Sequence, residues 1–129
     1  MKNFDYTVET GKTFEDAVRA VEEASVAHGF RVLHTHDIAK TLTEKGFPRE
    51  PLKIVEICNA KHASKILKQD PKLALMLPCP ISVYAHEGKT LISALRPNSM
   101  VEFYPETGIE ATAAAVEESI VAIVDEARG

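Results

Sequence analysis

The sequence contains no tryptophan, only two cysteines, and no apolar run long enough to cross a membrane. Its longest apolar stretch runs from about Leu73 to Val83 and is interrupted by Pro78 and Pro80, well short of the roughly 18 residues that a spanning helix needs. The first residues also lack the apolar segment of a secretory signal. These absences predict a cytoplasmic protein.

Clusters of basic residues are missing as well. The net charge is -4 and the sequence pI is about 5.7, whereas nucleic-acid binders usually carry a basic stripe. The glycines form neither a dinucleotide-binding fingerprint nor a phosphate-binding loop, and the serines lack a nucleophile-elbow context. Nucleic acid, anionic membrane surfaces and nucleotide cofactors are therefore not expected partners.

What the sequence does have is the composition of one globular domain. Its 129 residues are 45% hydrophobic and 26% charged, which is enough for a single domain over residues 1–129 with a core that needs no disulfide or metal. Because no export signal is present, Cys58 and Cys79 are expected to be free thiols in a reducing compartment.

Hydrophobic periodicity predicts five strands and several helices. Alternation indicates strands at 4–9, 30–36, 53–58, 81–86 and 89–95, and helical spacing indicates helices at 13–25, 37–42, 59–67, 97–103 and 108–127. Residues 71–78 are expected to form a long apolar connection. The order βαβαβαββ(α)α predicts an α+β two-layer sandwich, with a mixed, mostly antiparallel sheet of about five strands and helices packed on one face.

The most informative segment is the one that holds both cysteines. Cys58 precedes a predicted helix start at Asn59, where partial positive charge favours a thiolate, and His62 lies on the first turn of that helix. Cys79 opens a later strand. If the two strands are antiparallel neighbours, both thiols lie at the same edge of the sheet; a parallel crossover would separate them by roughly 15–20 Å.

Two interpretations of these residues stay open. Cys58, His62 and Cys79, with His36 or His34, are soft-metal ligands, and zinc is the ion expected with them. The alternative is that both cysteines are small buried hydrophobes, as free cysteines often are. Because the spacing is not that of a zinc knuckle, the second interpretation is favoured.

His34 and His36 form a second candidate site. Two histidines at alternate strand positions project to one face and can chelate a metal. They are expected to continue the apolar face of Phe30 and Val32 and to be partly buried near the strand's end. The alternative, a pair of hydrogen-bonded histidines at the margin of the core, is the favoured one.

Several segments together resemble the family catalogued as domain of unknown function 302. They are Tyr6-Thr7-Val8, Gly29-Phe30 before the histidine strand, Ile57-Cys58-Asn59-Ala60, Leu77-Pro78-Cys79 and the hairpin around Gly88. The resemblance covers nearly the whole chain and implies a compact prokaryotic α+β domain that forms homodimers, with no established activity. Members often have Asn-Pro where this sequence has Asn59-Ala60, and many lack one or both cysteines, which implies that any metal role belongs to a subgroup.

Three functions compete at this point. The first is a small-ligand or zinc-binding module around the cysteines. The second is a homodimeric interaction or regulatory protein, whose apolar interface would involve residues 73–77. The third is an enzyme with Cys58 as nucleophile and His62 as base. The sequence favours a protein without catalytic activity and ranks the binding module first.

Overall fold

The computed structural model describes residues 3–104 and 108–129. The described strands and helices follow the predicted order: β1 (Asp5–Thr10), α1 (Phe14–Ala27), β2 (Arg31–Asp37), α2 (Ile38–Glu44), β3 (Leu52–Cys58), α3 (Ala60–Gln69), the 3₁₀ helix η1 (Pro71–Met76), β4 (Cys79–His86), β5 (Lys89–Leu95), α4 (Asn98–Phe103) and α5 (Glu110–Arg128). None of the described helices is long and apolar enough to span a bilayer.

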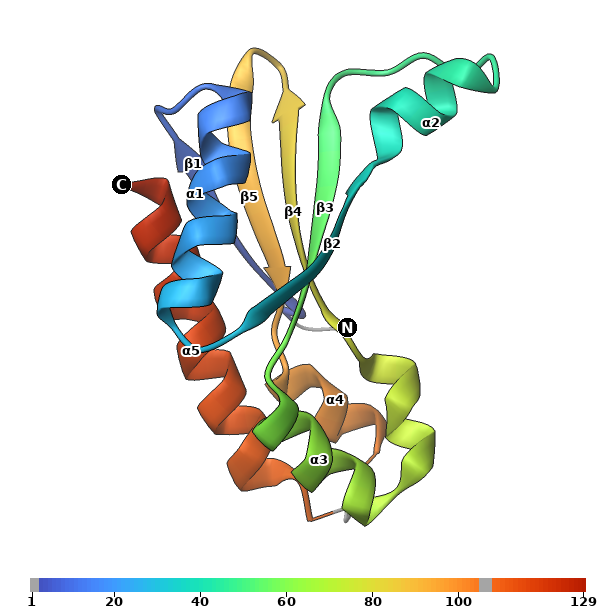
Figure 1. Cartoon of the computed structure of the whole chain (residues 1–129), viewed down its shortest axis with the longest axis vertical. Helices are drawn as coiled ribbons and strands as arrows, with labels where there is room; N and C mark the ends of the chain where they lie inside the picture. Colours follow the sequence, from blue (N-terminus) through green and yellow to red (C-terminus); the bar gives the residue numbers. More distant parts are fainter. Residues whose placement is uncertain (1–2, 105–107) are drawn as a thin grey trace.

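The five strands form one open sheet in the order β1-β5-β4-β3-β2. Every neighbouring pair is antiparallel. Figure 1 shows α1 and α5 side by side along the sheet, α2 projecting from one end of it, and α3 and α4 gathered at the other end. The predicted α+β sandwich, with helices on one face, is confirmed.

The main core lies between the sheet and the helix pair α1 and α5. Alternate strand residues point into it and are almost fully buried: Val8, Val55, Ile57, Ile81, Val83, Ile92 and Ala94. The helices contribute Val21 from α1 and Ile120, Ile123 and Val124 from α5, among others. Burying a side chain of this size is worth about 1.5–3 kcal/mol, so this layer holds the fold together.

A second, smaller core closes the end of the sheet. Ile66 from α3, Leu73 from η1, Met100 from α4 and Ile109 pack together with almost no exposure. Residues 71–76, expected to be a connection without regular structure, form a 3₁₀ helix instead. The Asp70 side chain caps its start and Pro71 occupies the first turn, where the missing N–H of proline costs nothing.

A β-bulge in β2 overturns the predicted placement of the two histidines. Val32 pairs with Ile57 but His34 pairs with Glu56, so Leu33 is an extra residue in the strand. A bulge of one residue moves everything beyond it to the opposite face. Thr35 consequently faces α1, and His34 and His36 point away from the apolar face of Phe30 and Val32.

Candidate functional site

The two cysteines lie at the same end of the sheet. Strands β3 and β4 are antiparallel neighbours, and Ile57 pairs with Cys79 directly beside Cys58, the last residue of β3. Helix α3 starts immediately afterwards, because the Asn59 side chain accepts a hydrogen bond from the His62 amide and donates one to the carbonyl of Gly29. This second bond ties the start of α3 to the end of α1.

A small cavity lies at this end of the sheet. Its volume is about 10 Å³, which is room for about one water molecule. Residues Phe30, Cys58, His62, Leu77, Cys79 and Met100 are part of its lining. Nδ1 of His62 is buried without a hydrogen-bond partner. Burial, followed by the charges of Lys65 and Lys61, lowers the pKa of His62, so its imidazole is neutral at pH 7.

The alternation of β3 directs the side chains of the two cysteines to different faces. Cys79 shares the face of its partner Ile57 and packs against the main core, whereas Cys58, one residue further on, lies on the opposite face. Burial, with a smaller contribution from Cys58, raises the pKa of Cys79 from 9.0 to about 11. Cys79 is therefore a protonated thiol at neutral pH, which is a poor nucleophile.

His36 lies apart from the other predicted ligands. It pairs with Ile54, four residues from Cys58 along β3, a separation of about 13 Å. Within residues 3–104 and 108–129, no three His, Cys, Asp or Glu side chains are placed so that they could hold a metal ion. The soft-metal site and the nucleophilic role of Cys58 stay predictions.

The face of the sheet opposite α1 and α5 has no helix on it in the described part of the chain. Because partners in register share a face, its composition follows from the strand pairs. The middle row runs Thr7, Ser93, Ser82, Ile54 and His36; the adjacent rows add Asp5, Leu95, Pro80, Glu56 and His34 on one side, and Glu9, Leu91, Tyr84 and Leu52 on the other. We call this surface the open face.

Polar contacts fix several side chains of the open face. Nε2 of His36 lies 2.6 Å from Oε1 of Glu56, and the rings of His34 and His36 are 4.4 Å apart in an edge-on arrangement. On the other half, the Ser93 hydroxyl lies 2.8 Å from the hydroxyls of both Thr7 and Tyr84. The half-buried side chain of Ile54 lies between these two groups, and half-buried Leu91 lies beside Tyr84 on the next strand.

Sequence reasoning concentrated on the cysteines and passed over the open face. One signal could have revealed it, because Leu52 and Ile54 are apolar at the positions of β3 that alternate with the buried Val55 and Ile57. A strand with apolar residues on both faces is typical of a strand covered on both sides.

Comparison with known proteins agrees with this architecture. A sequence model of the family described as "Domain of unknown function DUF302" matches residues 6–127. The chain belongs to this family. It is similar to the crystal structure of an uncharacterized conserved DUF302 protein from Bacillus stearothermophilus, with a TM-score of 0.91 and 29% identity over 97% of this chain and 98% of the other. No curated protein matches the chain.

Proposed function

We propose that this DUF302 protein is a homodimeric interaction module whose two copies pack through their open faces. The observation that carries the proposal is the open face itself, a complete sheet surface on which half-buried Ile54, Leu91, Leu95 and Tyr84 lie uncovered between hydrogen-bonded polar groups. Apolar centres with polar surroundings are typical of protein interfaces.

The size of the open face supports a second copy as its occupant. Five strands at a spacing of about 4.8 Å and a length of about 20 Å give a flat projection of roughly 500 Å². Side-chain relief makes the accessible area larger than this projection. The face is thus of the same order as the roughly 800 Å² that each partner contributes to a standard stable interface.

The charges at the two edges of the face also favour self-association. The β1 edge carries the carboxylates of Asp5 and of Glu9, which pairs with Lys89. The β2 edge carries the cation Arg31, with His34 and with His36 bonded to Glu56. A two-fold axis parallel to the central strand β4 lays the β1 edge of one copy over the β2 edge of its partner. Acidic and basic edges then meet twice, as an isologous interface requires.

A charge introduced near the centre of the face tests this proposal. Ile54→Lys should convert the dimer to a monomer, because each copy would bury an ammonium group without a partner in the interface. Val26→Lys is the matched control, since Val26 is an exposed aliphatic residue (63%) on α1. Light scattering after gel filtration measures the mass, and circular dichroism confirms that each variant is folded.

The outcome separates this interface from other surfaces. A monomeric parent protein at micromolar concentration would contradict the proposal, and so would a dimer that survives Ile54→Lys. Loss of the dimer in Leu75→Lys alone would place the interface at η1, where Leu75 is 79% exposed. That result would agree with the sequence-based expectation for residues 73–77 and overturn the open face as the interface.

A further inference from the structure

A groove lies on the covered side of the sheet, where α2 leaves it. Strand β2 passes directly into α2, which diverges from the start of α1 (Figure 1). The space between them has a volume of about 400 Å³, within the range of about 300–1,000 Å³ that is usual for small-molecule sites. Its walls come from four segments: the first turn of α1, the end of β2 with α2, the loop before β3, and β3 itself.

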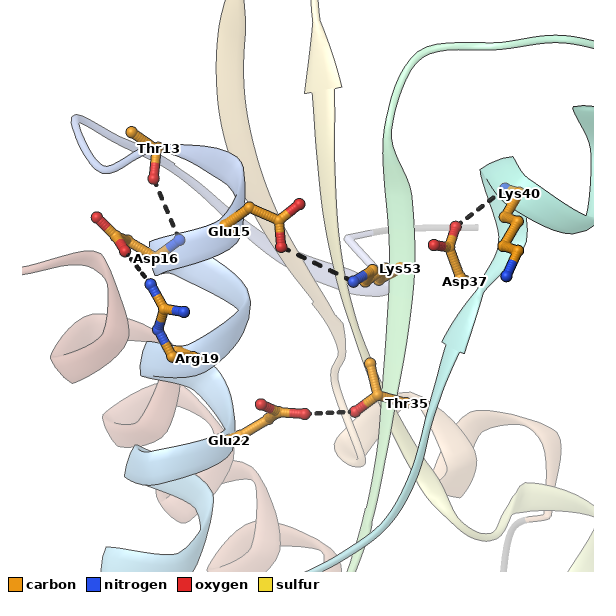
Figure 2. A network of polar contacts seen from close by, with 9 residues as sticks. All are labelled: Thr13, Glu15, Asp16, Arg19, Glu22, Thr35, Asp37, Lys40 and Lys53. Atoms are coloured by element: carbon orange, nitrogen blue, oxygen red, sulfur yellow. Dashed lines mark hydrogen bonds and ion pairs between the residues drawn. The ribbon is translucent and has the colours of Figure 1, made fainter.

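Lys53 is the most informative side chain in this groove. It occupies a covered-face position of β3, in register with Asp37, and its side chain is 25% exposed. Its ammonium nitrogen lies 6.0 Å from the centre of the Phe14 ring and 3.9 Å from Oε2 of Glu15 (Figure 2). A charge-assisted hydrogen bond needs about 2.7–2.9 Å, so Lys53 keeps donors available for a further partner.

The other charges of the groove are balanced. Lys40 and Arg49 add two cations, and within the described part of the chain neither forms an ion pair. Glu15, Asp37 and Glu44 supply three carboxylates. Asp37 is engaged at the start of α2, where it accepts the Lys40 amide at 2.9 Å (Figure 2), but Glu15 is 69% exposed and free to turn toward an ammonium group.

We propose that this groove binds a small zwitterion of the amino-acid class with an apolar side chain. Its carboxylate pairs with Lys53, its ammonium group pairs with Glu15, and its side chain lies on Phe14. A plain anion would meet the three carboxylates and a plain amine would meet the three cations, so each pays a repulsion that the zwitterion avoids. This function goes beyond self-association, because the groove and the open face lie on opposite sides of the sheet.

Ligands matched in shape test the charge requirement. L-phenylalanine, phenylpropanoate and phenylethylamine share one phenylethyl body and differ only in their charged groups. Amide chemical-shift titration of the whole chain, extended to the common L-amino acids, should show saturable binding of an apolar amino acid with a dissociation constant of about 1 mM or tighter. The carboxylate and the amine should bind at least about tenfold more weakly, since each lacks one charge-assisted hydrogen bond.

Variants then test the residues. Lys53→Met should weaken zwitterion binding by about 10-fold or more, while Lys72→Met, which removes a lysine with a similar 3.9 Å ion pair outside the groove, should leave it unchanged. Glu15→Gln changes an exposed side chain and removes the proposed partner of the ammonium group. It should therefore abolish the preference for L-phenylalanine over phenylpropanoate. Failure of all common amino acids to bind at about 10 mM, equal binding of phenylpropanoate, or full affinity in Lys53→Met would each overturn the proposal.

Discussion

The two faces of the sheet differ in what holds their side chains. On the face covered by α1 and α5, strand residues such as Val55, Ile57 and Val83 have no exposed surface. On the open face, the inner residues are half-buried, and Thr7, Glu9 and His34 on the edge strands are exposed. The same five strands therefore build the core with one set of residues and present an uncovered surface with the other, and stability and association are separable by substitution.

Truncation of neighbouring isoleucines gives the largest expected contrast. Ile57→Ala removes a fully buried side chain and should lower the free energy of unfolding by about 3–4 kcal/mol. Ile54→Ala, three residues earlier on the open face, should lower it by less than about 1.5 kcal/mol in dilute samples. Urea denaturation measures both, and equal losses would contradict the distinction between the faces.

The next effect concerns an ion pair that anchors α5 to the end of β5. Oε2 of Glu117 accepts hydrogen bonds from Nε and Nη2 of Arg96 at 3.1 and 2.9 Å, and its Oε1 accepts the Asn98 amide at 3.0 Å. Glu117→Ala leaves these donors without a partner and should cost about 2–3 kcal/mol. Glu118→Ala, on the exposed side of the same helix, is the control and should have little effect.

Acid should weaken the same contact. Burial alone would raise the pKa of Glu117, but the hydrogen bonds from Arg96 and the Asn98 amide outweigh it, and the pKa lies below the ordinary 4.5. A lowered folded-state pKa contributes stability that is present above pH 4.5 and is lost as the pH falls through the folded value. Denaturation curves below pH 4.5 should therefore show a smaller loss in Glu117→Gln than in the parent protein.

The next contrast is the rate at which the two thiols are alkylated. With its pKa raised from 9.0 to about 11, Cys79 should carry about 100-fold less thiolate than an unshifted thiol at neutral pH and react with iodoacetamide correspondingly slowly. Cys58, which is half-buried and does not belong to the main core, should react first. Mass spectrometry of digested samples resolves the two rates. Joint protection of both thiols together with about one zinc per chain would instead support the predicted soft-metal site.

The smallest contrast compares two tyrosines. The Tyr6 hydroxyl donates to Oδ1 of Asp125 on α5 at 2.6 Å, and this hydrogen bond is the largest cause of its raised pKa. Tyr6→Phe should lower the free energy of unfolding by about 0.5–1 kcal/mol. Tyr84→Phe, which removes the hydroxyl facing Ser93 on the open face, should cost a few tenths of a kcal/mol in dilute samples. The reverse order would show that the open face is the more tightly held one.

Much of this architecture is readable from the sequence, because the alternation in β1, β4 and β5 and the helical spacing in α1 and α5 are regular. The bulge at Leu33 could not be predicted, because an extra strand residue leaves no signature in a short run of mixed polarity. The prediction therefore placed His34 and His36 on the wrong face of the sheet. The groove around Lys53 was missed for another reason. It depends on the angle at which α2 leaves the sheet, which local patterns do not encode.

Cys58 and Cys79 show how much of the pairing between β3 and β4 could be inferred from the sequence. Antiparallel pairing of β3 and β4 was one of two routes that the sequence left open, and it is the one the structure has. Both cysteines line one small cavity, but neighbouring strand ends do not put them on the same face of the sheet. Ile57 rather than Cys58 is opposite Cys79, and one residue of register decides which sheet face a thiol occupies.

The central claim is that the open face pairs with its own copy, and an isotope-filtered nuclear Overhauser experiment tests it on the unaltered protein. A sample mixed from labelled and unlabelled chains reports only contacts between copies. The account predicts cross-peaks between chains from the methyl groups of Ile54, Leu91 and Leu95 and from the Tyr84 ring, and none from Val26. The absence of such cross-peaks, or their appearance only at Leu75 and Phe103, would contradict it.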